Sequence, residues 1–517
     1  MKNIFSLLAF MLSLIMMAQT APSIQWQKTL GGTNWDQGAS VCQTTDGGSI
    51  VAGYSPSTDG NVTGNHGGGD FWIVKLDNSG NIQWQKSLGG SDYDYAYSIK
   101  QTSDGGYIVA GRTESNDGDV TGYHGTVHPD FWIVKLDTIG NIQWQKSIGG
   151  SSHDVAYSIQ QTSDGGYIVA GESSSTDGDA VGHLPYNNTD LWIVKINSTG
   201  NIQWQKSFGG YGSEVAFDAK QTSDGGYIVA GATASNSGDV TLLYGEYDYW
   251  VLRLDSVGNL QWQKTFGGSG TENAQSVIQT SDGGYMVAGF SRSGNGLVHD
   301  HYGNLYTNDA WLIKLDGNGN IIWKKSKGGT GNDVANFIKE IPDGGYVFAG
   351  YSSSDDGDAV GNPTGSANYW IVRIDNNGNV IWQKSMGGSL ADFGQSMSQT
   401  SDGGFIMTGY SYSNDGDVSL HYGIPTYPDF WVVKLGPEVL STNETELLES
   451  FSIYPNPVTD KLFVSGLSSD EKYEIYSMIG QKIVSGITSQ FTIDVNALQK
   501  GVYFIQMKDK QQKFIKK

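Results

Sequence analysis

The sequence predicts an all-β protein: a seven-bladed β-propeller closed by its N-terminal strand and followed by a small C-terminal β-sandwich. Three markers, two tryptophans and the aspartate of a D-G-G turn, each recur seven times at intervals of 58 to 61 residues. Such a period is typical of propellers and solenoids. Glycine is abundant (72 of 517 residues) and proline is scarce (11), which suits short strands joined by tight turns. The markers are Trp26, Trp84, Trp144, Trp204, Trp262, Trp323 and Trp382; Trp72, Trp132, Trp192, Trp250, Trp311, Trp370 and Trp431; and Asp46, Asp104, Asp164, Asp224, Asp282, Asp343 and Asp402.

The N-terminus has the pattern of an export signal. Lys2 supplies a positive charge, Ile4 to Met17 form an apolar run, and Ala18 is a small residue suited to cleavage. The run is shorter than the roughly 20 residues of a membrane-spanning helix. We therefore expect residues 1–18 to be a signal peptide and the mature chain to have no transmembrane span.

One complete unit shows the layout of a blade. Residues 96–102, 107–113, 131–136 and 142–148 are rich in β-branched and aromatic residues, which favour strands. Tight turns join the first pair and the last pair, and a longer loop joins the middle pair. We name these strands a to d in chain order, with strand a nearest the axis. Four neighbouring strands per unit make a propeller blade.

The ends of the repeat predict how the ring closes. Residues 24–30 read as a strand d with no a, b or c before them, and the last unit, residues 393–435, stops after strand c. We expect the N-terminal strand to complete the last blade, which removes an open sheet edge. The propeller then covers residues 24–435. Blades are numbered from the strand a that follows residue 36.

The repeated tryptophans and cations have a structural interpretation. Fourteen of the 15 tryptophans occupy the two repeated positions, where we expect them to pack between blades. Each strand d, the outer edge of its blade, carries a lysine that discourages pairing with another sheet. Each strand c also carries a cation: Lys75, Lys135, Lys195, Arg253, Lys314, Arg373 and Lys434.

A different pattern follows residue 435. Residues 436–450 are polar and acidic, as a linker is. After the linker, short alternating segments predict a small β-sandwich. The expected strands are residues 462–466, 473–480, 481–486, 491–495 and 501–507.

The repeat resembles a bacterial β-propeller repeat family through W-x-x-x-x-G-G, D-G-G-Y-x-V-A-G and D-x-W-I-x-K-L, and its strand order is similar to that of kelch blades. This resemblance implies the fold and no particular chemistry. Residues 451–517 resemble the type A sorting domain of the type IX secretion system. That resemblance implies recognition by the outer-membrane translocon and its sortase, removal of the domain near the linker, and a location in the medium or on the outer surface of a Gram-negative bacterium. The matching residues are Tyr454, Pro455, Asn456, Pro457, Asp460, Leu462, Tyr476, Gly480, Leu498, Gly501, Tyr503, Lys516 and Lys517.

Composition narrows the choice of partners. The net charge is −22, and such a surface repels nucleic acid and anionic lipid. Cys42 is the single cysteine, so no intramolecular disulfide forms, and a small packed residue is the favoured interpretation of it.

The variable b–c loops and the d–a loops are expected on one face, the candidate binding face. Trp35, in a d–a loop, is a candidate ligand contact there. A carboxylate precedes every strand a. It either caps a turn by accepting backbone N–H groups, the favoured interpretation, or contributes to a ring of acids that binds a cation or a basic ligand. These residues are Asp36, Asp94, Asp154, Glu214, Glu272, Asp333 and Asp392.

Four b–c loops contain D-G-D. Alternating carboxylates around a glycine can bind calcium, whereas Asx-turns explain the pattern equally well. No other cofactor is indicated. Five loop histidines, His66, His124, His183, His301 and His421, are too dispersed for one zinc site. The candidate calcium ligands are Asp117, Asp119, Asp177, Asp179, Asp356, Asp358, Asp415 and Asp417.

Three functional classes remain open. The regular blades favour a non-enzymatic surface protein that binds or adheres, with a glycan or a surface protein as its ligand. A glycan-acting hydrolase is the alternative, although the chain lacks G-x-S-x-G and H-E-x-x-H motifs and has four arginines in the whole propeller. A purely structural surface-layer component is the third. An exposed aromatic cluster on the binding face would favour glycan binding.

Overall fold

The computed structural model describes residues 19–182, 188–440, 451–465, 467, 469–478, 480–507 and 510–517. The expected signal peptide and residues 441–450 of the expected linker lie outside these residues. The chain divides into two compact units, one formed by residues 19–440 and one that contains the C-terminal domain. The described residues form strands, turns and loops, and none of them belongs to a helix that could cross a membrane.

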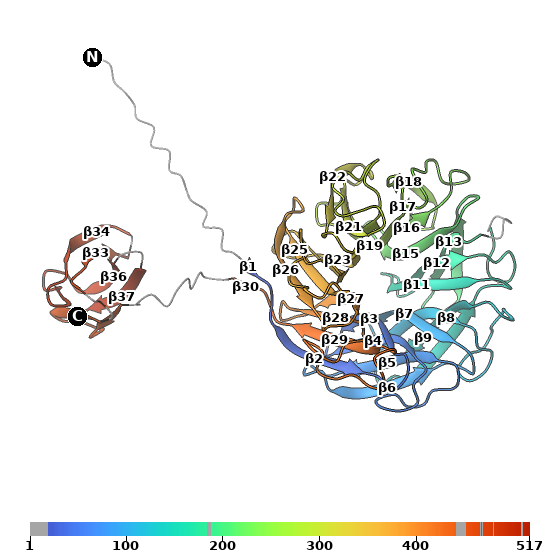
Figure 1. Ribbon diagram of the computed structural model, residues 1–517, viewed down its shortest axis with the longest axis horizontal. Coiled ribbons are helices and arrows are strands. Elements are labelled where there is room, and N and C mark those ends of the chain that lie inside the picture. The colour runs from blue at the N-terminus through green and yellow to red at the C-terminus, as the bar shows by residue number, and fades with distance from the viewer. Residues whose placement is uncertain are drawn as a thin grey trace, which may run out of the picture. The chain divides into compact units, whose positions relative to one another are not determined.

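The first unit is the predicted seven-bladed propeller (Figure 1). It contains seven four-stranded antiparallel sheets arranged around an axis, with strand a innermost in each. Strands a are β3 (Gln37–Gln43), β7 (Asp94–Gln101), β11 (Asp154–Gln161), β15 (Glu214–Gln221), β19 (Glu272–Gln279), β23 (Asp333–Glu340) and β27 (Asp392–Gln399). Strands b are β4 (Ser49–Ser55), β8 (Tyr107–Thr113), β12 (Tyr167–Ser173), β16 (Tyr227–Thr233), β20 (Tyr285–Ser291), β24 (Tyr346–Ser352) and β28 (Phe405–Ser411).

Strands c and d form the outer half of each blade. Strands c are β5 (Asp70–Leu76), β9 (Asp130–Leu136), β13 (Asp190–Ile196), β17 (Asp248–Leu254), β21 (Asp309–Leu315), β25 (Asn368–Ile374) and β29 (Asp429–Leu435). Strands d are β6 (Ile82–Leu88), β10 (Ile142–Ile148), β14 (Ile202–Phe208), β18 (Leu260–Phe266), β22 (Ile321–Lys327), β26 (Val380–Met386) and, for blade 7, β2 (Ile24–Leu30).

The ring closes as predicted. β2 pairs antiparallel with β29, with Leu30 opposite Phe430, so the two ends of the propeller share blade 7. A second, shorter pairing, of β1 (Gln19–Thr20) with β30 (Val439–Leu440), lies outside the blades. Closure of this kind leaves no unpaired seam between the first and last blades.

Aromatic side chains pack blade against blade, as predicted. The strand-c Trp132 is fully buried, with its ring 4.5 Å from that of Phe71 in the preceding blade. The strand-d Trp84 lies edge-on to Tyr107 of the next blade at 5.8 Å. Aromatic pairs with these separations add about 0.5–1.5 kcal/mol beyond the burial of their area.

The strand-c cations have a role that the sequence did not reveal. In every blade the cation reaches the aspartate of the D-G-G turn, at nitrogen–oxygen distances from 2.5 to 3.1 Å. The side chain of this cation is buried; Lys135, for example, is 3% exposed. Burial by itself raises the pKa of Asp104, but hydrogen bonds from Thr102 and Lys135 bring this pKa down to about 2.

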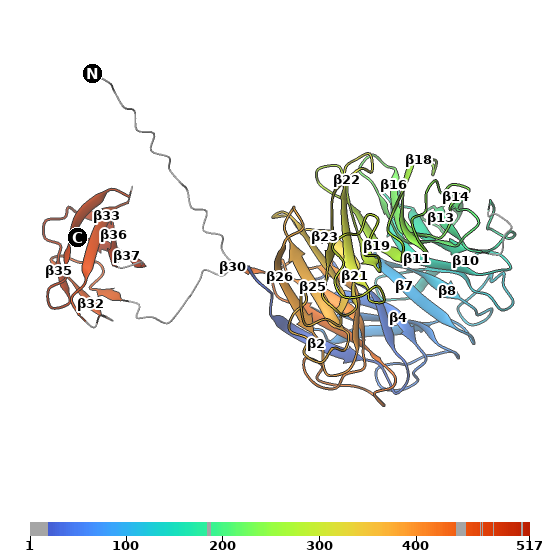
Figure 2. The same cartoon turned by 45° about the horizontal axis from the view of Figure 1, so that its top comes forward.

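The C-terminal unit is a two-sheet domain (Figure 2). One sheet has the order β31-β32-β35 and the other β34-β33-β36-β37, and buried residues such as Leu462, Ile475 and Phe514 form one core. This agrees with the predicted small β-sandwich. The strands are β31 (Ser452–Tyr454), β32 (Lys461–Ser465), β33 (Lys472–Ser477), β34 (Lys482–Ile487), β35 (Thr492–Asp494), β36 (Gly501–Met507) and β37 (Lys510–Lys516).

Candidate functional site

The innermost strands surround a central cavity of about 180 Å³. Every strand a contains a register shift against its strand b three residues after the repeated carboxylate. Such a β-bulge leaves one residue unpaired and re-aims its side chain. All seven bulged residues line the cavity: Ala39, Tyr97, Tyr157, Phe217, Gln275, Asn336 and Gln395.

The bulged residues divide the cavity into two unlike halves. Blades 2 to 4 contribute aromatic rings, with 5.2 Å between the centroids of Tyr97 and Tyr157 and 5.4 Å between those of Tyr157 and Phe217. Blades 5 to 7 contribute the amides. Asn336 donates to the carbonyl of Gly394 at 2.8 Å, whereas Gln275 and Gln395 make no side-chain hydrogen bond within the described part of the chain. An aromatic wall therefore faces polar groups with free hydrogen-bonding capacity.

A charged layer lies further along the same strands. Asp218 is buried and accepts hydrogen bonds from Lys220 (2.5 Å), Ser158 (3.0 Å) and the backbone N–H of Val277 (3.2 Å). Lys100 also lines the cavity. Burial, followed by repulsion from Lys220, lowers the pKa of the Lys100 ammonium.

Aromatic residues also lie at the end of the cavity where the strands a begin. The ring of Tyr95 stacks on that of Tyr54 at 3.9 Å, and the guanidinium of Arg112 lies 4.5 Å from the centroid of the Tyr95 ring. Phe393 contacts Tyr410 at 5.2 Å across blade 7. Aromatic rings of blades 1, 2 and 7 therefore pack together near the start of the strands a.

The repeated carboxylates, one of the predicted features, do not face a ligand. All seven are fully buried. Asp94, for example, accepts hydrogen bonds from the N–H of Gly90 (2.9 Å) and the hydroxyl of Ser115 (3.0 Å), and so ties the d–a loop to the b–c loop. This is the geometry of the turn-capping interpretation. All seven acids are buried inside the blades, so the structure does not place them as an exposed ring on the binding face.

A second buried acid lies beside each of these carboxylates at six of the seven blade junctions. The first residue of strand c is an aspartate there, and a Cβ atom in place of the hydrogen of Gly89 would lie within 2.7 Å of oxygens of both Asp70 and Asp94. Burial, with a contribution from Asp70, raises the pKa of Asp94 to about 7. The seventh junction has Asn368 in the place of the second acid.

The aspartates of the D-G-D loops likewise accept hydrogen bonds from other parts of the propeller. Asp117 accepts the N–H of Ser91 at 2.7 Å, and Asp119 accepts that of Gly89 at 3.3 Å. Equivalent bonds reach Asp177, Asp356 and Asp415. Across the described residues, no group of three or more His, Cys, Asp or Glu is arranged to hold a metal ion. The D-G-D aspartates therefore join the b–c loop to the d–a loop, through bonds between residues 26 or 30 positions apart.

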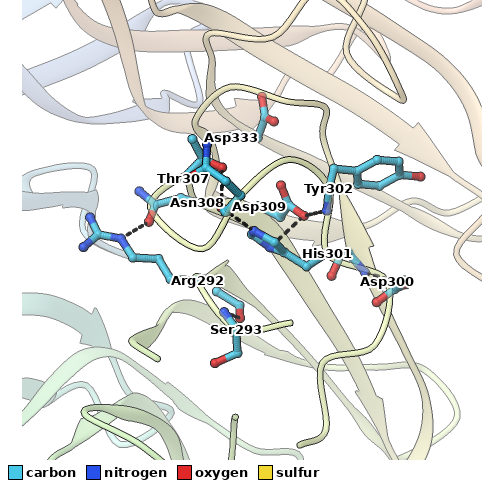
Figure 3. Close-up of polar contacts among 12 residues, drawn as sticks. Arg292, Ser293, Asp300, His301, Tyr302, Thr307, Asn308, Asp309 and Asp333 are labelled. Atoms are coloured by element: carbon cyan, nitrogen blue, oxygen red, sulfur yellow. Dashed lines mark hydrogen bonds and ion pairs between the residues drawn. The ribbon is translucent and has the colours of Figure 1, made fainter. Parts of the chain in front are cut away.

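The loop histidines pair with the strand-c aspartates. Figure 3 shows His301 of blade 5, whose Nδ1 lies 3.0 Å from Asp309 and whose Nε2 lies 3.0 Å from the carbonyl oxygen of Asn304. His66, His124 and His421 make the same contact with their aspartates, at 2.7 to 3.1 Å. His183 lies outside the described residues. Trp35 is 39% exposed on its d–a loop.

The sequence analysis named none of these cavity residues, because it looked for the binding face in the b–c and d–a loops and not in strand a. A signal was present. In an otherwise regular repeat, the third residue after the carboxylate changes from alanine to tyrosine, phenylalanine, glutamine or asparagine, and the sixth is Lys100, Lys220 or Lys339 in alternate blades. Divergence at these positions of a regular repeat marks a place where function can break the symmetry.

The predicted sorting residues lie together in the C-terminal domain. Asn456 donates to the carbonyl of Lys513 (3.0 Å) and accepts the N–H of Ile515 (2.9 Å), and the N–H of Lys517 bonds to Val458. Gly480 takes a φ of 77° in a tight turn, and Tyr503 stacks on Phe514. The Tyr454–Pro457 segment is thereby fastened to the last strand of the chain.

Comparison with known proteins identifies this domain. Residues 452–517 match the family described as the secretion system C-terminal sorting domain. The chain is accordingly exported by type IX secretion and is secreted or displayed at the cell surface, as the sequence predicted.

The propeller has more distant relatives. It is 26% identical over 194 residues to the regulatory protein FlaEY of Caulobacter vibrioides, covering 34% of this chain and 20% of that protein. It is 22% identical over 486 residues to an uncharacterized WD repeat-containing protein of Acanthamoeba polyphaga mimivirus, covering 77% of this chain and 32% of that protein. The chain thus spans less than a third of the length of either relative. Among solved structures, puromycin hydrolase matches at 11% identity and a TM-score of 0.45, covering 90% of this chain and 61% of the other.

Proposed function

We propose that the propeller is a non-enzymatic carbohydrate-binding module that type IX secretion delivers to the medium or the cell surface. The observation that carries this proposal is the asymmetry of the seven bulged residues. Aromatic rings on three neighbouring blades offer a surface for the apolar C–H face of a sugar. Amides on blades 5 to 7 offer donors and acceptors for its hydroxyl groups. A small number of polar groups in a largely aromatic recess is a common form of ligand site.

The absence of an exposed carboxylate pair in this cavity supports binding over hydrolysis. Glycoside hydrolysis commonly uses two acids on either side of the scissile bond. Among the described residues that line the cavity, Asp218 is the one acid, and Lys220 and three other donors surround it.

The test is binding of the full secreted chain to an array of neutral and acidic oligosaccharides. We expect Tyr157→Ala to weaken binding at least about tenfold, or roughly 1.4 kcal/mol, because it removes the middle ring of the aromatic wall. Ile139→Ala, in an exposed c–d turn on the opposite face, is the matched control and should leave binding unchanged. Equal binding by the Tyr157 variant and the parent, or an array without any bound glycan, would refute the proposal.

A further inference from the structure

We propose that the central cavity recognises an acidic sugar unit, a uronic acid, whose carboxylate binds the ammonium group of Lys100. This inference rests on the proposed carbohydrate binding and adds the chemical class of the sugar. It starts from a contrast in charge. The chain as a whole carries a net charge of −22, yet the cavity is lined by Lys100, Lys220 and Asp218, which leaves one positive charge in excess.

The two lysines differ in their partners. Lys220 forms an ion pair with Asp218 at 2.5 Å. The other oxygen of Asp218 is occupied by Ser276 (3.4 Å) and Val277 (3.2 Å), so this acid has little capacity left for a second cation. Lys100 forms no hydrogen bond or ion pair with any described residue. It is the cavity's unpaired cation.

An unpaired ammonium in a confined space is costly to the fold. Partial removal of a charged group from water, without a partner to offset it, disfavours the charged form. Four of the six other blades have an uncharged residue at the equivalent position, namely Cys42, Gln160, Ile278 and Ser398, and the other two carry Lys220 and Lys339. The lowered pKa of Lys100, from burial and then from Lys220, has the same origin. A bound carboxylate would offset the effects of burial and of Lys220 on the ammonium, because it supplies the missing opposite charge.

The surroundings of Lys100 specify an anion carried on a sugar ring. Tyr97, on the same strand, begins the aromatic wall, and the amides of Gln275 and Gln395 complete the cavity. Its volume of about 180 Å³ is below the roughly 300–1,000 Å³ of pockets for larger organic ligands. One pyranose ring suits that space. A free phosphate or sulfate would satisfy the lysine but leave the aromatic wall without a partner.

The experiment compares an oligogalacturonate with its methyl ester, which removes the charge and keeps the ring. Calorimetric titration of the full secreted chain should show that the acid binds at least about tenfold more tightly than the ester. Lys100→Gln should bind both with the affinity of the ester, and Lys100→Arg should restore the preference. Lys339→Gln is the matched control, because Lys339 occupies the equivalent position in blade 6 but is exposed at the rim. It should keep the preference.

The outcomes separate the two proposals. Equal binding of acid and ester by the parent would overturn the uronate assignment and leave carbohydrate binding intact. If Lys339→Gln also loses the preference for the acid, the preference arises from general surface charge. The uronate assignment is then overturned as well. Tyr157→Ala should lose both ligands, because the ring wall serves either one. If the parent binds neither ligand, the uronate assignment is refuted. The oligosaccharide array then decides whether the propeller binds carbohydrate. If Lys100→Gln does not fold, titrations of the parent at high salt take its place. High salt should weaken binding of the acid and leave binding of the ester unchanged.

Discussion

Blade 5 lacks a hydrogen bond that the six other blades possess, because one side chain of its strand d differs. The indole N–H of each strand-c tryptophan donates to a strand-d glutamine, as Trp72 does to Gln85 at 2.8 Å. In blade 5 the glutamine is replaced by Lys324, and the N–H of Trp311 has no acceptor although this tryptophan is fully buried. A buried donor without a partner costs about 1–3 kcal/mol.

We therefore expect Lys324→Gln to stabilise the propeller. Supplying the missing acceptor should raise the free energy of unfolding by about 0.5–1.5 kcal/mol. Chemical denaturation of the variant and the parent measures the change. The reverse substitution in blade 1, Gln85→Lys, should lower stability, and a destabilised Lys324→Gln would contradict the explanation.

The paired buried acids predict a loss of stability at high pH. Asp248 is fully buried, and burial followed by repulsion from Glu272 raises its pKa to about 7, from the usual value near 4. The folded state therefore binds this proton more tightly than the unfolded chain does. The contribution of Asp248 is most favourable below about pH 4 and is lost progressively as pH rises through 7.

Asp248→Asn should abolish this dependence. The change copies the natural residue Asn368 at the equivalent position of blade 6. At pH 8 the variant should be more stable than the parent by about 1–3 kcal/mol, and the difference should disappear near pH 4. Denaturation at both pH values tests this. Asn368→Asp should show the opposite behaviour, and a pH-independent difference for either variant would disprove the mechanism.

At the scale of the element, strand a serves two purposes at neighbouring positions. The bulge points one residue into the cavity, and the next residue, usually a serine, accepts a backbone N–H from strand a of the adjoining blade. Ile99 donates to Ser40 at 3.2 Å and Ile159 donates to Ser98 at 3.3 Å. The serine is therefore constrained by blade packing. The bulged residue is free of that task, and this freedom lets it differ from blade to blade.

An ion pair connects strand c of each blade to the a–b turn of the same blade. Lys135 donates to Asp104 and to the carbonyl of Leu136 at 3.0 Å, so it holds the D-G-G turn against the end of the blade. We expect Lys135→Met to lower the free energy of unfolding by about 1–3 kcal/mol, because that carbonyl and Asp104 lose a charged donor. Lys146→Met, on the outer strand of the same blade, should change stability by less than about 0.5 kcal/mol. Equal effects in a urea titration would show that the ion pair has no special role.

At the scale of the whole molecule, closure and loop bonding make the propeller one unit. β2 joins the last blade, and β1 with β30 adds a second pairing of the two ends. Each d–a loop is bonded to the b–c loop of its blade through the buried carboxylate and, in most blades, through a D-G-D aspartate.

Calcium should therefore have little effect on the thermal stability of the chain. A ligand that binds only the folded state raises the melting temperature. Because the D-G-D carboxylates already accept backbone N–H groups, we expect the melting temperatures in millimolar calcium and in chelator to agree within about 1 °C. A calcium-dependent rise that disappears in Asp117→Asn would restore the metal interpretation of these loops.

The sequence by itself determined the fold and the export route. Seven copies of the same markers impose one blade structure on each unit, because β-branched and aromatic runs between D-G-G turns have few other ways to bury their apolar faces. The permuted residues 24–30 predicted the closure. The Tyr454–Pro457 motif and the C-terminal lysines predicted the sorting domain, since such a motif must be readable in the chain itself.

Only the tertiary structure decided which residues face the cavity and which are buried. The repeated acids before strand a look like a ring of ligands in the sequence, yet folding places them against loop N–H groups at 0% exposure. The bulge reverses the usual alternation of a strand, so period-two reasoning cannot tell that Tyr97 and Tyr157 point toward the axis. Likewise, Lys220 pairs with Asp218 of its own strand, whereas Lys100 has a serine at the matching position. Whether Lys100 meets an acid in the cavity depends on side chains of other blades, and local sequence carries no record of such contacts.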